Sequence, residues 1–314
     1  MLSRAGILVA AALASELTSC AAHPLARASR EAPPPQPVSG QQTTQPTVTP
    51  SVASSEQDAG SEADAGAQAL NAPPSAVCPS GMLHVKFDYC PELRRRCLDK
   101  EYDKPNHITI CNRFADEKPE CRAARVPLDF CIDDFEYPNR AGAKPPVMVN
   151  FYEASGLCAA EHKRLCYESE WVAACEGPDE KPFPYGYVRS SQQCNFDNRW
   201  VDPHLERVYA KDPEIVRAEL ARLDRSLPSG QKAGCVSDYG VHDLTGNVDE
   251  WALADYDRPR EHAKFAALKG GAWGHVRNAC RPVTTSHVPE FRYYFIGFRC
   301  CGEPVREREL EQPE

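Results

Sequence analysis

The segment that decides the fold of this 314-residue chain is Gly240-Val241-His242-Asp243-Leu244-Thr245-Gly246-Asn247-Val248-Asp249-Glu250-Trp251. Gly240 and Gly246 allow backbone angles that other residues avoid, so the chain can turn back on itself within a short distance. Such a backbone path lets the carboxylate oxygens of Asp243 and Glu250 point toward one position. Backbone carbonyls that make no hydrogen bonds in regular structure can point toward the same position. Calcium is held by six to eight oxygens of these kinds. The alternative is a surface loop whose polar side chains serve only their own turn.

Three further segments accompany this one in a fixed order: Lys163–Trp171 (K-R-L-C-Y-E-S-E-W), Lys269–Trp273 (K-G-G-A-W) and Gly297–Arg299 (G-F-R). Together the four segments resemble the sulfatase-modifying-factor family, whose best-known member is the formylglycine-generating enzyme. The family signatures read K-R-L-P-T-E-x-E-W, G-L-x-D-x-x-G-N-V-W-E-W, R-G-G-S-W and G-F-R. The resemblance covers residues 78–302 and implies an α+β fold of the formylglycine-generating-enzyme type. This fold is C-type-lectin-like and has little regular secondary structure.

The N-terminal part of the chain has a different character. Residues 1–19 are typical of a signal peptide, and Leu17-Thr18-Ser19-Cys20 resembles a bacterial lipobox in which Cys20 is lipidated. The alternative is an ordinary cleaved signal with an incidental Cys20. Residues 20–77 are rich in Pro, Ala, Ser, Thr and Gln without an apolar period, which predicts a disordered linker. We expect an exported chain, lipid-anchored to a bacterial membrane and facing the periplasm or the cell surface, with a charged tail at 303–314.

Cysteines indicate a disulfide framework. All but one of the fifteen lie between Cys78 and Cys301, and an even number in an exported chain predicts disulfide bonds. No pair has the Cys-x-x-Cys spacing that is common in zinc sites. The resemblance implies one bridge, between Cys158 and Cys300. It also places Cys175 at a family disulfide position whose usual partner is a threonine here, so Cys175 is expected to pair with Cys280 or Cys301.

Periodicity predicts a few regular elements. Residues 126–132 alternate apolar and polar side chains, as a half-buried strand does. Residues 150–161 have helical spacing with Leu157 on the inner side, and a second helix is expected to start near Tyr167. An insertion at 201–232 holds a third helix from Asp212, with an apolar side that includes Ile215 and Ala218. This insertion is either a lid over the core or a wall of the binding cleft.

The resemblance also assigns metal ligands. In the family, one structural calcium is bound by side chains at the positions of Asp243 and Glu250 and by carbonyls at the positions of Gly246 and Val248. All four positions are filled compatibly with a hard cation. A tentative second site takes the side chain of an asparagine and the next carbonyl, which correspond to Asn195 and Phe196.

The catalytic positions of the family are filled differently. Its reaction converts a sulfatase cysteine into formylglycine, with oxygen and a copper(I) ion held by two cysteines, which are the soft ligands that copper(I) prefers. These two positions fall on His275 and Cys280, and a required serine falls on Ala272. In the substrate cleft, Asp249 replaces a tryptophan and lies with Ala272 and Trp273. The resemblance therefore makes copper and formylglycine generation unexpected, and leaves His275 and Cys280 as the candidate catalytic residues.

Two functions follow from these observations. The first is a binding or accessory module whose cleft holds an unknown peptide, protein or glycan. The alternative is an oxidoreductase of the formylglycine-generating (sulfatase-maturation) type, or another metal- and oxygen-dependent enzyme on the same fold. His275 could join His242 and His287 in a different metal site, or serve as an ordinary hydrogen-bonded residue. A net charge of −9 without a basic stripe argues against nucleic-acid binding.

Overall fold

The computed structural model describes residues 77–104, 106–274 and 277–305. The predicted signal peptide, the lipidation site Cys20, the linker up to residue 76 and the tail from residue 306 lie outside the described residues. The candidate catalytic residue His275 lies outside them too. Within the described ranges, no helix combines the length and the apolar character needed to cross a membrane.

Two four-stranded sheets form the framework of the fold, with strand orders β1-β6-β12-β7 and β10-β9-β8-β11. Only the β8–β11 pair is parallel within these two sheets of the described chain. Two smaller sheets pair β2 with β5 and β3 with β4. The strands are β1 Met82–Tyr89, β2 Leu93–Arg94, β3 Cys97–Asp103, β4 Ile108–Phe114, β5 Glu120–Cys121, β6 Val126–Asp133, β7 Arg164–Leu165, β8 Asp249–Leu253, β9 Ala266–Lys269, β10 Val283–Thr284, β11 Ile296–Phe298 and β12 Cys300–Gly302. The helices are α1 Phe151–Ala160, α2 Glu168–Glu176, α3 Leu205–Val208, α4 Pro213–Leu223 and the 3₁₀ helix η1 Glu261–Lys264.

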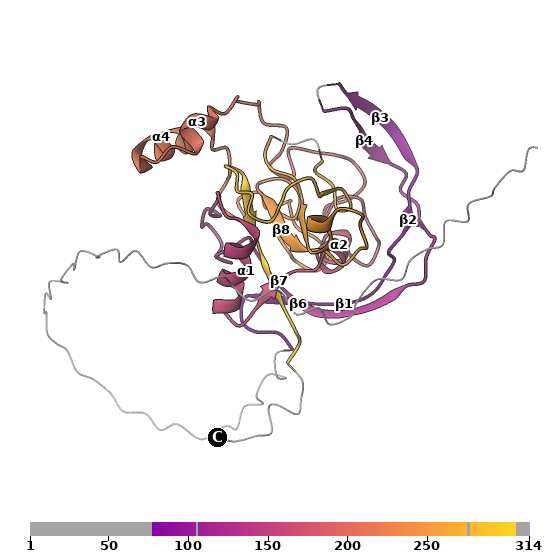
Figure 1. Cartoon of the computed structure of the whole chain (residues 1–314). Coiled ribbons are helices and arrows are strands. Elements are labelled where there is room, and N and C mark those ends of the chain that lie inside the picture. The colour runs from indigo at the N-terminus through magenta and orange to yellow at the C-terminus, as the bar shows by residue number, and fades with distance from the viewer. Residues whose placement is uncertain (1–76, 105, 275–276, 306–314) are drawn as a thin grey trace, which may run out of the picture.

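The apolar core is divided between the two main sheets. One cluster joins Phe151 of α1 to Trp251 of β8 and Phe298 of β11. A second cluster joins Trp171 of α2 to Phe130 of β6. In Figure 1, α1 and α2 lie beside the sheets, whereas the β3–β4 hairpin and the α3–α4 pair lie at opposite sides of the view. The fold is α+β with short elements, as the sequence predicts.

Helix α1 is confirmed, but its buried side differs from the prediction. Asn150 caps the helix: its side-chain oxygen accepts from the Glu153 backbone N–H at 2.9 Å, and the Glu153 carboxylate accepts from the Asn150 N–H. The buried residues are Phe151, Ala154 and Cys158, which are spaced to lie along one stripe. The prediction that Leu157 points inward is wrong, since Leu157 is 37% exposed and lies outside this stripe.

Helix α2 starts where the sequence predicts and is buried on every side. Tyr167 is its N-cap residue, and Trp171 lies fully in the core. Glu170 is buried as well, because Arg164 donates to its two oxygens at 2.6 and 2.8 Å. A buried carboxylate requires such a partner. Arg164 lies in β7 and Glu170 lies in the first turn of α2, so this ion pair connects the helix to the sheet.

All cysteines in the described ranges are paired. Cys158–Cys300 agrees with the pairing that the family resemblance implies, and Cys175 pairs with Cys280 rather than with Cys301. The seven bridges are Cys78–Cys131, Cys90–Cys121, Cys97–Cys111, Cys158–Cys300, Cys166–Cys301, Cys175–Cys280 and Cys194–Cys235.

The inserted helix α4 begins as predicted but faces the core differently. Asp212 caps it by accepting from the Glu214 N–H at 2.9 Å. Its buried residues are Leu223 and Glu219, whereas Ile215 is 39% exposed and Ala218 is exposed. The predicted apolar side is therefore only partly used. Glu219 can be buried because its carboxylate faces Arg222 and accepts from the His204 backbone N–H at 2.9 Å.

Candidate functional site

The four signature segments meet where the two main sheets adjoin. In the second sheet, Glu250 of β8 lies opposite Gly297 of β11 on one side and Lys269 of β9 on the other. The chain then passes from β11 to β12, where Cys300 pairs with Leu165 of β7. Segments separated by more than a hundred residues thus form adjoining strands, and the loop 240–248 lies at the entrance to β8.

Glu250 and Arg299 form a buried ion pair within this assembly. The Arg299 guanidinium donates to the two Glu250 oxygens at 2.7 and 2.8 Å, and the Trp171 indole N–H donates to Oε2 at 2.9 Å. Both charged side chains are 1% exposed. The neighbouring carboxylates, chiefly that of Glu250, raise the pKa of Arg299 although burial alone would lower it, so Arg299 stays charged.

A second set of buried acids adjoins this pair. Glu136 is fully buried; its carboxylate accepts from the Asn247 side-chain amide at 2.9 and 3.0 Å and from the Ser229 hydroxyl at 2.9 Å. Burial is the main cause that raises the pKa of Glu136, and the charges of Asp243 and Glu250 raise it further. Asp243 accepts from the Gly230 N–H at 2.6 Å, and burial raises its pKa too. These acids outnumber the guanidinium of Arg299, and the pKa values of Glu136 and Asp243 are raised accordingly.

The proposed calcium ligands have the donor chemistry that a hard cation requires. A carboxylate offers about four lone-pair positions, and the three donors on Glu250 leave one of them open. Asp243 uses Oδ2 for Gly230, which leaves Oδ1 for another partner. Three buried acids beside one guanidinium would be balanced by a divalent ion. Asp243, Glu250 and the carbonyls of Gly246 and Val248 thus have the donor types that calcium takes, and calcium binding by them stays a prediction.

Asn195 and Phe196 lie against the same loop. The Asn195 backbone carbonyl accepts from the Asn247 N–H at 2.8 Å, and its side-chain amide donates to Asn247 Oδ1 at 2.9 Å. The Asn195 side-chain oxygen accepts from Asn198 at 2.8 Å. Phe196 is buried beneath the Arg189 guanidinium, which lies 4.5 Å from its ring centre. These contacts connect the tentative second calcium segment to the first, and the second site stays a prediction.

The candidate catalytic residue Cys280 is held in the disulfide with Cys175. The Cys280 backbone N–H donates to the Pro182 carbonyl at 3.0 Å, and the residue is fully buried. A disulfide sulfur is not a thiolate, and only the thiolate is a copper(I) ligand of the kind the family uses. Cys280 in this state therefore does not fit the family copper site.

The three residues assigned to the cleft are all buried. Ala272 is inaccessible and carries no hydroxyl, and Trp273 is 4% exposed. Asp249 accepts from the Gly271 N–H at 3.2 Å, and burial raises its pKa to about 7. An acid at this position near neutrality could accept or release a proton. The cleft assignment itself stays a prediction.

The histidines of the alternative metal site have other partners. His242 lies with Nδ1 2.7 Å from the Asp134 carboxylate and stacks on Phe135. His287 stacks on Phe291 with ring centres 4.0 Å apart, and burial lowers its pKa. Among the described residues, no group of three or more histidines, cysteines or acids is arranged to hold a metal.

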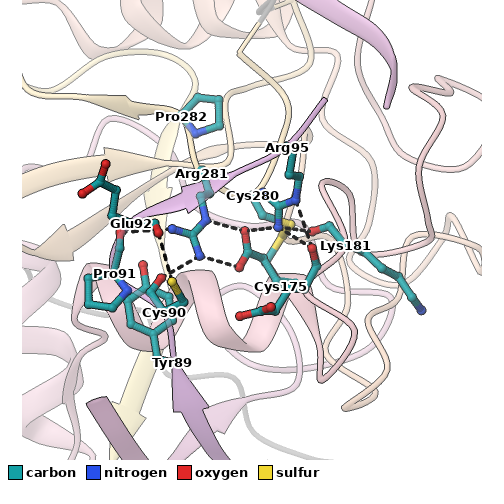
Figure 2. Close-up of polar contacts among 12 residues, drawn as sticks. Tyr89, Cys90, Pro91, Glu92, Arg95, Cys175, Lys181, Cys280, Arg281 and Pro282 are labelled. Carbon is teal, nitrogen blue, oxygen red and sulfur yellow. Dashed lines mark hydrogen bonds and ion pairs between the residues drawn. A yellow bond between two sulfur atoms is a disulfide. The ribbon is translucent and has the colours of Figure 1, made fainter. Parts of the chain in front are cut away.

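The Cys175–Cys280 bridge adjoins a carboxylate that the sequence did not reveal. Glu176 follows Cys175, and its side chain is inaccessible. Arg281, which follows Cys280, donates to both Glu176 oxygens at 2.7 and 2.9 Å, and Arg95 donates to Oε1 at 2.7 Å (Figure 2). The disulfide and the Arg281–Glu176 ion pair thus join the same two segments. Arg95 adds a third segment to this cluster.

Comparison with known proteins gives the same assignment as the motifs. The family model for the sulfatase-modifying factor enzyme 1-like domain matches residues 129–304. The chain belongs to this family. Its fold is accordingly the disulfide-rich α+β fold of formylglycine-generating-enzyme-like domains.

Two curated relatives and one solved structure illustrate the similarity. The inactive C-alpha-formylglycine-generating enzyme 2 of Bos taurus is 29% identical over 178 residues, which cover 52% of each chain. The formylglycine-generating enzyme of Mus musculus is 23% identical over 180 residues, covering 51% of this chain and 44% of the relative. The structure of PvdO from Pseudomonas aeruginosa has a TM-score of 0.44 at 15% identity, covering 70% of this chain and 94% of PvdO. The chain spans about half the length of the curated relatives it matches.

Sequence reasoning missed Glu136, and it missed Glu176 with the two arginines that face it, Arg95 and Arg281. None of these residues belongs to a family signature, and isolated acids beside cysteines or aromatics are common. One signal was present: Glu176 ends a helix whose other residues are mostly apolar. A carboxylate in such a position must be paired if it is buried.

Proposed function

We propose that this family member lacks copper-dependent formylglycine generation and acts as an exported, lipid-anchored binding or accessory module. The observation that carries the proposal is the Cys175–Cys280 disulfide, which removes the thiolate at one of the two copper positions. The absence of a hydroxyl at Ala272, where the family has its serine, supports the same view. A relative whose name calls it inactive is consistent with it.

Export is supported by the disulfide framework. Seven bridges in one domain favour an oxidising compartment such as the periplasm or the cell surface. Lipidation of Cys20 is tested by expressing the full chain in a bacterium fed radiolabelled palmitate. We expect label in the unaltered chain and none in Cys20→Ser, and label in both variants would disprove attachment at Cys20.

The decisive experiment measures free thiols and activity on the same sample. We expect no reaction with a thiol reagent in denaturant without reductant, in a chain carrying Cys20→Ser. We also expect no conversion of a Cys-x-Pro-x-Arg peptide with copper(I) and oxygen, before or after mild reduction. One titratable thiol together with conversion of the peptide would establish the alternative oxidase function.

A further inference from the structure

A groove of about 470 Å³ separates the β3–β4 hairpin from the segment 277–283 that follows the signature K-G-G-A-W. Its hairpin side lies before residue 129, outside the part of the chain that the family model matches. Its other side contains Cys280's neighbours Ala279 and Arg281. The groove is therefore built partly from residues that the family model matches and partly from a hairpin outside the matched range.

The hairpin supplies an apolar wall. Ile108 and Ile110 of β4 are two residues apart in the regularly paired part of the strand, so they lie on one face, and both are half-buried. Phe114, at the end of β4, is also half-buried and lines the groove. Phe114 contacts the buried Phe183 edge-on, with ring centres 6.0 Å apart. The hairpin forms a separate two-stranded sheet and carries the Cys97–Cys111 bridge. Its apolar face is thus held in place while part of it stays accessible.

The rest of the groove carries more positive charges than the neighbouring acids neutralise. Four arginines line the groove, and Glu176 pairs with two of them, Arg95 and Arg281. Asp197 pairs with Arg189. Within the described ranges Arg277 has no ion pair, and its guanidinium donates to the Thr284 hydroxyl at 2.9 Å. Asp249, which is buried, interacts electrostatically with Arg277. Four cations against three acids leave a formal excess of one positive charge in a chain of net charge −9.

Arg189 is a largely buried member of this set of arginines. Its side chain is 10% exposed, and its Nε is buried without a hydrogen-bond partner in the described part of the chain. Its terminal nitrogens are occupied by Asp197, and one of them also reaches Asn278 Oδ1 at 3.5 Å. Arg189 therefore adds positive charge to the groove but offers no open donor to a ligand, which leaves Arg277 as the contact for an anion.

We propose that this groove binds a short extended peptide segment in which one acidic side chain is flanked by branched apolar side chains. The acid contacts Arg277, and the apolar side chains pack on Ile108 and Ile110. The alternation of an extended peptide matches the spacing of the β4 side chains. A single carboxylate neutralises the local excess of positive charge. A polyanion would instead be repelled by the negative net charge of the chain. This inference rests on the proposed function as a binding module and names its ligand class.

The test uses the purified full chain and three peptides carrying a neutral dye, with binding followed by fluorescence anisotropy. The peptides are acetylated and amidated Leu-Val-Glu-Leu-Val and its analogues with Gln or Lys at the centre. We expect the Glu peptide to bind at least tenfold more tightly than either analogue, and the difference to shrink as salt is raised. Equal binding of the three peptides, or no binding of any at 1 mM, overturns the proposal.

Two variants locate the site. Arg277→Gln should weaken binding of the Glu peptide by about 10- to 100-fold, which corresponds to the loss of one charged hydrogen bond. Arg260→Gln removes the same charge from an exposed position outside the groove and should change binding less than twofold. An equal loss in both variants overturns the assignment. If the dye-labelled peptides do not bind as expected, while the chain has no free thiol and does not convert the Cys-x-Pro-x-Arg peptide, only the proposed ligand class is refuted. Conversion of the Cys-x-Pro-x-Arg peptide would refute the proposed function itself.

Discussion

Glu250 and Arg299 form a buried, two-pronged ion pair that joins the entrance of β8 to the segment after β11. Two signature segments, G-N-V-D-E-W and G-F-R, thus act as one structural unit. Their contact forms inside the core, where neither charge can be left alone. The ion pair therefore makes these two segments depend on each other for stability.

Removing one member of this pair should destabilise the domain strongly. Arg299→Met leaves the Glu250 carboxylate buried without its cation, and we expect a loss of about 3–5 kcal/mol in the free energy of unfolding. The matched control is Arg292→Met, whose partner Glu153 lies in a pair that is 43% and 44% exposed. There the expected loss is at most about 1 kcal/mol. Urea unfolding with disulfides intact measures both, and equal losses would contradict the role of the buried pair.

Gly246 should not tolerate a side chain. Its φ is +87°, and a Cβ atom there would lie 2.4 Å from the Asn195 carbonyl oxygen. Gly142 has a φ of +75° with nothing within 4 Å of a Cβ. Gly142→Ala should therefore cost only the backbone penalty of about 1–2 kcal/mol. Gly246→Ala should cost at least about 2 kcal/mol more, because packed backbone must move. Thermal unfolding of both variants tests the difference.

Calcium should stabilise the chain through Asp243. Asp243 has a φ of +58°, so Asp243→Gly removes the carboxylate without backbone strain. We expect calcium at 100 times its dissociation constant to add about 2.7 kcal/mol to the stability of the unaltered chain, measured against chelator. The Asp243→Gly variant should show little or no gain. Identical melting temperatures of the unaltered chain with calcium and with chelator would show that no calcium binds.

Lys269 should make stability depend on pH in the alkaline range. It is buried, and burial lowers its pKa from 10.5 to about 8, although its Nζ donates to the carbonyls of Arg281 and Pro282 at 3.0 Å. Between pH 8 and 10.5 the unfolded chain holds a proton that the folded chain has released, so stability rises with pH there. We expect a rise of about 2 kcal/mol between pH 7 and pH 9.5.

The control for this effect is Lys269→Met, which removes the titrating group while preserving an apolar stem. The variant should be less stable at every pH, since two carbonyls lose their donor. Its stability should nevertheless lack the rise between pH 7 and pH 9.5. Parallel pH profiles of the variant and the unaltered chain would assign the rise to another group.

The sequence by itself determined the family, the α+β fold class and the starts of helices α1, α2 and α4. These follow from local chemistry: glycines at tight turns, Asn150 and Asp212 as caps, and apolar periodicity. Cys158–Cys300 also followed from the sequence, but only through the family resemblance.

Tertiary structure decided which polar groups share the interior. The choice of Cys280 over Cys301 as partner of Cys175 depends on how the segment before β10 approaches α2, and spacing carries no record of that approach. Glu136, Glu176 and Glu219 are buried because distant donors reach them, although their local sequence would place them at the surface. The outward position of Leu157 is likewise set by how α1 packs on the rest of the chain, which the periodicity of the helix does not reveal. Burial is a property of contacts between remote segments, and periodicity within one segment cannot encode it.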